Sequence, residues 1–300
     1  MSGVLPFWRS LLFVPANVPK FIDKAPSVGA DGIQFDLEDA VAPSEKPAAR
    51  KAVPLAARKL KDSGADIVVR INRPWRLAIR DLEEVVVPEV DALTLPMVDS
   101  AEHIKAISEI VGELESERGL EVGRIKLIGL IEETSAFFRA ESIARADPRL
   151  VAISLGSEDF ARSAGMISMP ETLNYPKQHI VFAARAAGIR AMGFIGSIAD
   201  FRDMDAFRLI VQRSKLFGFR GASCIHPTQV TVCNEEFAPS QAEAEEARKI
   251  VAAYDEALAA GIGAINLDGK MIDVPVADSA REIVELDDAL RARGRAANPS

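Results

Sequence analysis

The sequence predicts a (β/α)₈ TIM barrel with a C-terminal helical tail. Eight short apolar segments recur along residues 1–238, mostly about one strand–helix unit apart, and most stretches between them have the residue spacing of helices. No Gly-x-Gly-x-x-Gly turn follows an early strand, which disfavours the rival architecture, a doubly wound open sheet. Eight such alternations are typical of the barrel, whose functional sites form at the C-terminal ends of its strands.

The predicted elements divide the chain into a barrel and an extension. The strands are expected at 10–15, 32–37, 67–71, 92–97, 127–131, 151–155, 190–195 and 222–225. The barrel helices are expected at 18–28, 44–61, 101–114, 136–146, 179–187, 206–217 and 229–237. After residue 237 come an Ala- and Glu-rich helix at 240–260, a loop or short hairpin at 261–268, and a last helix from about 278 to 291. We therefore predict a barrel at 1–238 that carries the site. The helical extension at 239–300 is predicted to pack on its own subunit or on a neighbouring one.

The composition is that of an ordinary globular protein and excludes several functional classes. Apolar residues make up 48% of the chain and charged residues 27%. The net charge of −8 comes from dispersed acids and offers no basic face for a nucleic acid. Two cysteines cannot build a disulfide framework, and no apolar run is long enough to cross a membrane. Residues 1–8 lack the features of a signal peptide, so we expect a cytoplasmic protein.

Two neighbouring predicted strands end in acidic residues. Glu132 and Glu133 follow the strand at 127–131, and Glu158 and Asp159 follow the strand at 151–155. Parallel neighbours project their C-terminal ends to the same side, so Glu132 and Asp159 are expected to converge. Two carboxylates in an apolar sheet repel each other, and Mg²⁺ is a natural remedy for that repulsion. The alternative is that these acids simply begin the following helices, where the helix dipole favours them.

Two further strand segments and the residues just after position 155 carry polar groups that can line a site. Glu38 and Asp39 follow the second strand and precede the next helix, so they are not part of its first turn. Arg70 lies inside an apolar strand and needs a buried anionic partner, either a substrate or a structural acid. Gly156 and Ser157 present backbone N–H groups before a helix, which is a ready cradle for a carboxylate.

Other reactive residues give weaker signals. Arg9 begins the first strand and is expected either at the opposite rim or pointing inward. His226 follows the last strand, and a structural role is as plausible as a catalytic one. Cys224 lies within that strand and is expected to be a core residue. No Ser-His-Asp or Cys-His signature is visible.

Seven motifs in order give the chain a family resemblance. They are Arg9-Ser-Leu-Leu-Phe-Val-Pro, Asp36-Leu-Glu-Asp-Ala-Val-Ala-Pro, Val69-Arg70-Ile-Asn, Leu130-Ile-Glu-Glu-Thr, Leu155-Gly-Ser-Glu-Asp-Phe, Cys224-Ile-His-Pro-Thr-Gln-Val and Asp268-Gly-Lys-Met-Ile-Asp-Val-Pro. Over nearly its whole length the chain resembles the citrate lyase β-subunit-like branch of the HpcH/HpaI aldolase superfamily. Each motif falls at a predicted strand end or in the tail.

The resemblance implies an activity and a set of site residues. It implies a carbon–carbon lyase that depends on Mg²⁺, with Mn²⁺ as the alternative, and that is usually a homotrimer or hexamer. Such enzymes cleave malyl-, citramalyl- or citryl-thioesters to an α-keto acid and an acyl thioester, or run the reverse condensation. The implied roles are metal ligation by Glu132 and Asp159, a place around the metal-bound waters for Glu38 and Asp39, binding of the keto-acid carboxylate by Arg70, and proton transfer by Asp273, which the tail of one subunit delivers to the next. We also expect Gly156, Ser157 and Arg9 to take part in substrate binding.

Some positions depart from the family pattern and keep alternatives open. Glu133 replaces the usual Thr after the metal glutamate, so Glu132 is chosen by the match of Leu130-Ile131. Gly193 to Gly196 stand where relatives usually place an Asp, and Ala222 where many carry Lys. Whether coenzyme A carries the acyl group therefore stays open. The alternatives are an aldolase acting on a free hydroxy-keto acid without coenzyme A, and the β subunit of a citrate lyase-like complex.

Overall fold

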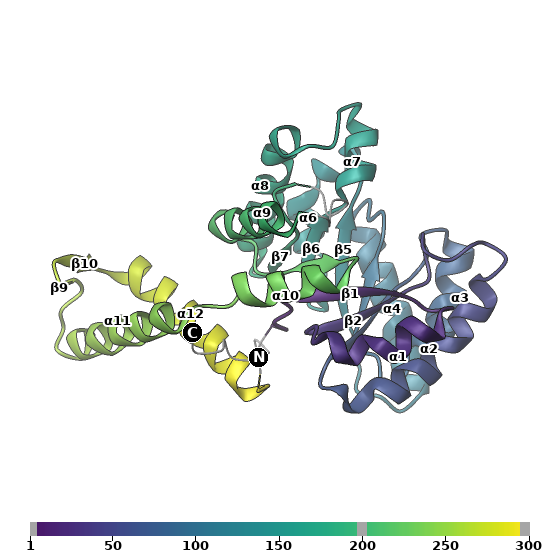
Figure 1. Ribbon diagram of the computed structural model, residues 1–300, viewed down its shortest axis with the longest axis horizontal. Coiled ribbons are helices and arrows are strands. Elements are labelled where there is room, and N and C mark those ends of the chain that lie inside the picture. Colours follow the sequence, from purple (N-terminus) through teal and green to yellow (C-terminus); the bar gives the residue numbers. More distant parts are fainter. Residues whose placement is uncertain (1–4, 197–202, 295–300) are drawn as a thin grey trace. The chain divides into compact units, whose positions relative to one another are not determined.

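The computed structural model describes residues 5–196 and 203–294, and the chain forms two compact units, Met1–Asn234 and Glu235–Ser300. The first unit contains an eight-stranded parallel sheet with helices around it (Figure 1). Its strands are β1 (Ser10–Pro15), β2 (Gly32–Asp36), β3 (Asp66–Arg70), β4 (Ala92–Leu95), β5 (Lys126–Ile131), β6 (Leu150–Leu155), β7 (Arg190–Met192) and β8 (Ala222–Cys224). All eight predicted strands are present, each within a few residues of its predicted bounds.

The strand order closes the sheet into a barrel. Each strand from β2 to β7 pairs in parallel with the strand before it, and β1 also pairs with β8. Between β7 and β8, Gly193 N donates to Gly221 O at 2.8 Å and Arg220 N donates to Ala191 O at 3.3 Å. The predicted (β/α)₈ barrel is confirmed by this nearly closed ring of parallel strands and its surrounding helices.

The helices of the barrel mostly follow the prediction, with three differences. They are α1 (Pro19–Lys24), α2 (Lys46–Leu60), α3 (Trp75–Val85), α4 (Ala101–Glu117), α5 (Thr134–Phe137), α6 (Ala140–Ala144), α7 (Ser157–Ala164), α8 (Pro170–Ala187), α9 (Met204–Phe217) and α10 (Pro227–Glu236). The sequence pattern missed α3 and joined α5 and α6 into one helix. It also missed the first half of α8, where Pro176 lies inside the helix and resembles a break.

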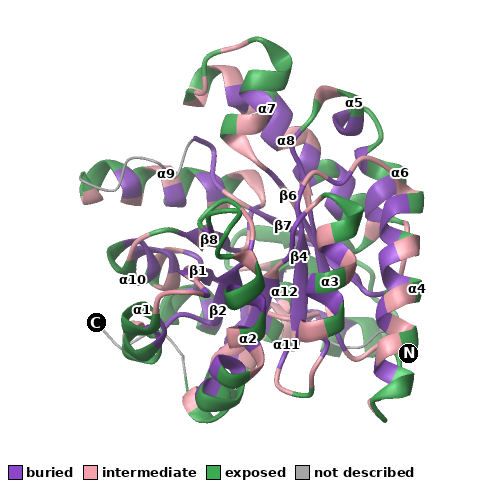
Figure 2. Cartoon of the chain, turned by 90° about the vertical axis from the view of Figure 1, so that its right-hand side faces the viewer, coloured by how far each residue is buried: buried purple, intermediate pink, exposed green. Residues whose placement is uncertain are grey.

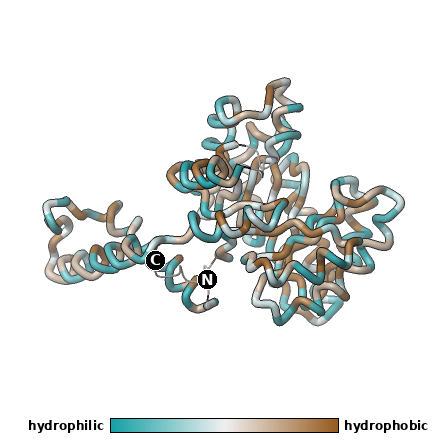
Figure 3. The backbone as a smooth tube through the Cα atoms, viewed as in Figure 1, coloured by the Kyte–Doolittle hydropathy of each residue, from teal (hydrophilic) through white to brown (hydrophobic). Residues whose placement is uncertain are grey.

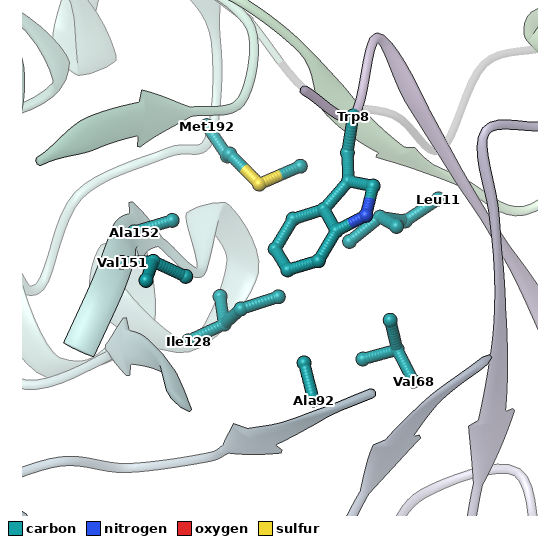
Figure 4. Packing of buried hydrophobic residues seen from close by; sticks show 8 residues of the cluster. All are labelled: Trp8, Leu11, Val68, Ala92, Ile128, Val151, Ala152 and Met192. Carbon is teal, nitrogen blue, oxygen red and sulfur yellow. The ribbon is translucent and has the colours of Figure 1, made fainter. Parts of the chain in front are cut away.

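The lower interior of the barrel is filled by side chains from most of its strands. Trp8, just before β1, packs with Leu11, Val68, Ala92, Ile128, Val151, Ala152 and Met192 (Figure 4). Its indole Nε1 donates to Asp66 Oδ2 at 2.6 Å, so the one polar atom of the ring is satisfied. A Cβ at Gly221 would lie 1.7 Å from Trp8 O, so only glycine fits there. The packed floor leaves the opposite end of the barrel, where the strands terminate, as the place for a site.

Burial and hydropathy follow the expected layers of this architecture. The strands are almost wholly buried, whereas the barrel helices are buried on one side and exposed on the other (Figure 2). Along these helices hydrophobic and hydrophilic stretches follow one another (Figure 3). This pattern is typical of helices that pack one apolar face against a sheet. Within the part of the chain that the structure describes, no helix combines the length and the hydropathy needed to span a bilayer.

The second unit consists of two long helices and a hairpin. Its elements are α11 (Gln241–Ala259), the antiparallel strands β9 (Ile265–Leu267) and β10 (Lys270–Ile272), and α12 (Val274–Ala292). Tyr254, Ile272 and Ala277 form its core, and Arg248 Nη1 contacts Asp287 Oδ2 at 2.8 Å between the helices. The helix expected from about 278 begins earlier because Asp273 caps it, with Pro275 in its first turn.

Candidate functional site

Four strand ends at the carboxyl rim of the barrel bring charged residues together. Glu38 and Asp39 follow β2, Arg70 ends β3, Glu132 follows β5, and Asp159 lies in the first turn of α7 after β6. These strands run parallel in one barrel, so their carboxyl ends open onto the same rim. The strand ends share one rim as the sequence predicted, and the joint role expected of Glu132 and Asp159 stays a prediction.

Arg70 is held by an acid on the neighbouring strand. The β2–β3 register sets Asp36 opposite Arg70, and Arg70 Nε and Nη2 donate to the two Asp36 oxygens at 2.8 and 2.6 Å. Its Nη1 lies 2.9 Å from Glu38 Oε2 and 3.3 Å from Asp39 Oδ2, and the Phe13 ring packs 4.8 Å from the guanidinium carbon. The structural ion pair is thus present, and it leaves the Nη1 end of Arg70 facing the rim.

Glu38 has the electrostatics of a proton-transfer group. Burial raises the pKa of Glu38 to about 8, the hydrogen-bonded Asp39 carboxyl adds to this, and the Arg70 charge opposes it. Glu38 Oε2 also accepts the Asp39 N–H at 3.0 Å. A carboxyl group with such a pKa can take up or release a proton near neutral pH.

Glu132 fits its position because a glycine stands opposite it. The β5–β6 register pairs Ile131 with Leu155, and Gly156 N donates to Ile131 O at 3.0 Å. Glu132 and Gly156, which follow these two paired residues, therefore lie opposite each other. A Cβ at Gly156 would lie 2.6 Å from both Cγ and Oε1 of Glu132, so a larger residue would displace the carboxylate. Glu133, the alternative metal ligand, is exposed instead.

A backbone group missed by the sequence prediction completes the environment of Glu132. Met97 N, in the loop after β4, donates to Glu132 Oε2 at 2.6 Å. The sequence prediction assigned little chemistry to this strand end, because a backbone N–H has no residue signature. Only the structure reveals that this loop turns its amide toward the neighbouring strand.

Asp159 and Ser157 are set by the start of α7. Asp159 Oδ1 contacts Arg162 Nη2 at 2.9 Å, and the Arg162 side chain is 75% exposed, so this ion pair contributes little and is readily exchanged. Ser157 Oγ donates to Gly196 O at 3.4 Å, which ties the loop after β6 to the end of β7. The first N–H groups of α7 have no acceptor within the helix and can serve an anion, as the sequence predicted for Gly156 and Ser157.

The donor set fits a hard divalent cation. Burial raises the pKa of Glu132 to about 7, and the negative charges of Asp159 and Asp39 add to this, whereas the Met97 N–H and Arg70 oppose it. A cation between Glu132 and Asp159 would relieve the repulsion and keep both ionised. No group of three or more His, Cys, Asp or Glu side chains in residues 5–196 and 203–294 could hold a metal ion. A cation here would therefore rest on two carboxylates and complete its shell with water and substrate, which suits Mg²⁺.

Two of the expected site residues lie elsewhere. Arg9 precedes β1, at the amino end of the barrel, so the opposite-rim position is the one found. Arg9 Nε and Nη2 each donate to Asp31 at 2.9 Å, and Nη1 donates to Asn234 O at 3.1 Å. The expectation that Arg9 binds substrate is corrected, because its side chain is 5% exposed and is paired with Asp31 at the end of the barrel opposite Glu132. Asp273 belongs to the second unit, where its side chain accepts the Val276 N–H at 3.5 Å.

The remaining candidates contact residues close to them in the chain. His226 Nδ1 lies 2.8 Å from Thr228 Oγ1 at the start of α10. Cys224 is buried as expected, with its Sγ 3.6 Å from Cys233 Sγ, and both cysteines are free thiols.

Comparisons with known proteins match nearly the whole chain. A family model described as HpcH/HpaI aldolase/citrate lyase matches residues 9–227. Citrate lyase subunit beta from Haemophilus influenzae is 35% identical over 280 residues, covering 92% of this chain and 96% of that protein. L-malyl-CoA/beta-methylmalyl-CoA lyase from Rhodobacter capsulatus is 34% identical over 299 residues, covering 92% and 93%.

A solved structure shares the fold. CitE from Mycobacterium tuberculosis, in complex with magnesium, acetoacetate and coenzyme A, superposes with a TM-score of 0.69 at 28% identity, covering 94% of this chain and 98% of that chain. RipC from Yersinia pestis has a TM-score of 0.63 at 30% identity, covering 78% and 97%.

Proposed function

Because the chain belongs to the HpcH/HpaI aldolase/citrate lyase family, we propose that it is a Mg²⁺-dependent carbon–carbon lyase of the citrate lyase β-subunit-like branch. Its substrate is a malyl- or citramalyl-CoA-like 3-hydroxyacyl thioester, which it cleaves to an α-keto acid and an acyl-CoA, or forms in reverse. The observation that carries the proposal is that Arg70, Glu132 and Asp159 come from strand ends on one rim, with Glu132 Oε1 facing the start of α7 across Gly156.

Glu132 and Asp159 would hold the cation, Mg²⁺ or alternatively Mn²⁺. When bound, such an ion supplies Lewis acidity to the hydroxyl or keto oxygen of the substrate. Gly156 gives the Glu132 carboxylate the space to face α7, and the N–H groups around Gly156 and Ser157 provide a place for a substrate carboxylate.

Arg70 orients the keto-acid part of the substrate. Asp36 engages the Nε–Nη2 edge of the guanidinium, so the group is fixed before substrate arrives. The Nη1 end, which faces Glu38 and Asp39, can exchange these acids for a substrate carboxylate. A positioned charge of this kind reduces the entropy that the reaction must lose when the reacting atoms align.

Cleavage moves one proton off the hydroxyl group and another onto carbon. As the hydroxyl proton leaves, the electrons of the carbon–carbon bond pass to the acyl fragment, whose carbon must then be protonated. The pKa of about 8 makes Glu38 suited to the first transfer. We assign the second to Asp273, carried by the extension of a neighbouring subunit in a homotrimer or hexamer, as the family resemblance implies.

A substrate panel tests the reaction. Purified protein with Mg²⁺ is incubated with malyl-, citramalyl- and methylmalyl-CoA, and the α-keto acid is trapped as its phenylhydrazone. We expect keto acid from at least one thioester, its loss with EDTA, and its return with added Mg²⁺. Glu132→Gln should be inactive under all conditions. Keto acid release that EDTA and Glu132→Gln both leave unchanged would rule out the proposal.

One relative favours a second candidate. The Haemophilus influenzae protein is named as a subunit of citrate lyase, so this chain could be the β subunit of a similar complex. In that case the purified chain would be inert toward coenzyme A thioesters and would release keto acid only from a citryl thioester on an acyl carrier. An aldolase acting without coenzyme A would instead cleave the free hydroxy-keto acid. We place either reaction in the cytoplasm, because a chain with only two cysteines fits a reducing compartment.

A further inference from the structure

The loop after β4 adopts an unusual backbone conformation where it meets Glu132. Met97 has a φ of 46°, one of two positive values among non-glycine residues in the described parts of the chain. This conformation turns the Met97 N–H to Glu132 Oε2 at 2.6 Å, while the next amide, Val98 N, donates to Leu130 O at 2.9 Å. A methionine does not favour left-handed backbone, so neighbouring groups must hold it there.

Arg73 supplies that restraint from the end of the neighbouring strand. Its Nε donates to Met97 O at 3.1 Å, and its Nη2 donates to Asp99 Oδ2 at 2.6 Å. The guanidinium also packs 5.7 Å from the Trp75 ring, which limits its other orientations. Arg73 therefore clamps the turn at Met97 itself and two residues beyond it.

The two oxygens of Glu132 meet different surroundings. Oε2 is occupied by the Met97 N–H. Oε1 is the oxygen that a Cβ at Gly156 would meet at 2.6 Å, so it faces the start of α7, which carries Asp159. The carboxylate is thus held with one oxygen turned toward β4 and the other toward the proposed metal ligand.

We propose that Arg73 and the left-handed turn at Met97 are a positioning device that engages Glu132 Oε2 and presents Oε1 alone to the cation. Both residues act on the cation site through Glu132, so they are positioning residues. The inference rests on the proposed metal site and adds to it a specific one-oxygen coordination by Glu132. Outer contacts of this kind orient a ligand before the metal arrives.

The direction of the change in cation affinity distinguishes a positioning role of Arg73 from a purely electrostatic one. Removing a positive charge near a cation site strengthens cation binding if Arg73 acts only through its charge. If Arg73 positions Glu132, its removal weakens binding despite the lost repulsion. Arg76, which is exposed in the first turn of α3, offers a matched control that removes the same charge three residues away.

Mn²⁺ binding to the substrate-free protein measures the change in cation affinity directly. Free Mn²⁺ is followed by electron paramagnetic resonance for wild type, Arg73→Met, Arg76→Met and Glu132→Gln, with folding checked by circular dichroism. We expect Arg73→Met to bind Mn²⁺ about 10-fold more weakly and Arg76→Met to bind as wild type does. Equal or tighter binding by Arg73→Met would overturn the inference.

Changes at Met97 test the same positioning role at the turn itself. Glycine adopts left-handed backbone readily, so Met97→Gly in the Arg73→Met protein should recover part of the lost affinity. Met97→Val should weaken binding even with Arg73 present, because a β-branched residue resists this conformation. No recovery with glycine together with no loss with valine would refute the turn's role. If Arg73→Met fails to fold, Met97→Val in the wild-type background decides alone, and unchanged Mn²⁺ affinity of that variant would refute the turn's role.

The Glu132→Gln variant distinguishes a failure of the proposed metal site from a failure of the positioning role of Arg73 and Met97. If wild type binds Mn²⁺ and Glu132→Gln does not, the metal site stands whatever Arg73→Met does. If Glu132→Gln binds as tightly as wild type, the metal site itself is wrong, and the positioning role is overturned with it.

Discussion

Glu132 can occupy its position at the rim because Gly156, on the neighbouring strand end, has no side chain beyond a hydrogen atom. The backbone of Gly156 has a φ of −73°, which any residue can adopt, so its conformation does not require glycine. The limited space requires glycine instead, because a Cβ at this position would lie 2.6 Å from the Glu132 carboxylate. The chain therefore keeps glycine here for the sake of a side chain on the neighbouring strand.

We predict that Gly156→Ala inactivates the enzyme without unfolding it. The added methyl group must displace the Glu132 carboxylate, and a shift of about 1 Å in a catalytic group costs on the order of 10²-fold in rate. Turnover of the best thioester substrate and Mn²⁺ affinity both measure the effect. Gly263→Ala is the control, because no atom lies within 4 Å of its Cβ position. Full activity of Gly156→Ala would show that Glu132 is free to move.

His103 makes the free energy of unfolding of the barrel depend on pH in the acidic range. Burial lowers the pKa of His103 to about 4, the nearby Arg73 charge adds to this, and Asp99 opposes it. Its Nδ1 is buried without a hydrogen-bond partner in the described structure, and Asp99 Oδ1 is 3.8 Å away. The native state thus holds this imidazole neutral at pH values at which the unfolded chain protonates it.

We predict that wild type loses stability that His103→Leu retains as the pH falls from about 6.5 to about 4. Over this range the unfolded state binds the proton and the native state does not, so the free energy of unfolding decreases with falling pH. The difference amounts to about 3 kcal/mol at the lower limit, at 1.36 kcal/mol per pKa unit. Urea unfolding at a series of pH values measures it. Parallel pH profiles for the two proteins would contradict the prediction.

At the scale of elements, strand register explains why the sequence predicted much of the site. Register pairs Asp36 with Arg70 and Ile131 with Leu155, so residues that end neighbouring strands must meet. Counting residues from each apolar run therefore located Glu132, Asp159 and Arg70. The same counting could not find Met97, whose role depends on a backbone angle. Nor could it choose between the two places left open for Arg9, because its Asp31 partner lies on another loop.

The start of α12 lets one substitution separate a structural role of Asp273 from a catalytic one. Asp273 is the N-cap of this helix and accepts the Val276 N–H. Asparagine caps a helix as well as aspartate does, but it cannot transfer a proton. We predict that Asp273→Asn keeps the melting temperature of wild type and lowers turnover about 10²-fold or more. Asp273→Ala should lose activity and about 1 kcal/mol of stability as well. A fully active Asp273→Asn would leave the residue only its capping role.

At the scale of the whole molecule, the two-unit organisation bears on how a complete site is assembled. Glu132 and Arg70 belong to the unit Met1–Asn234, whereas Asp273 belongs to Glu235–Ser300. If the extension serves a neighbouring subunit, no chain can be active alone. We therefore predict an oligomer, and because the family resemblance implies a homotrimer or hexamer, sedimentation velocity should show at least a trimer.

The strongest test of this assembly combines two inactive proteins. Arg70→Ala leaves the extension intact, and Asp273→Asn leaves the barrel intact. We predict that mixed oligomers of the two recover part of the wild-type activity, because some sites then receive Arg70 from one chain and Asp273 from another. The mixture must be refolded together or co-expressed, so that subunits exchange, and two Arg70→Ala preparations treated in the same way provide the baseline. An active monomer would exclude the shared site. An oligomer that gains nothing on mixing would require that each extension serves the barrel of its own chain, since only then does every site carry one of the two defects.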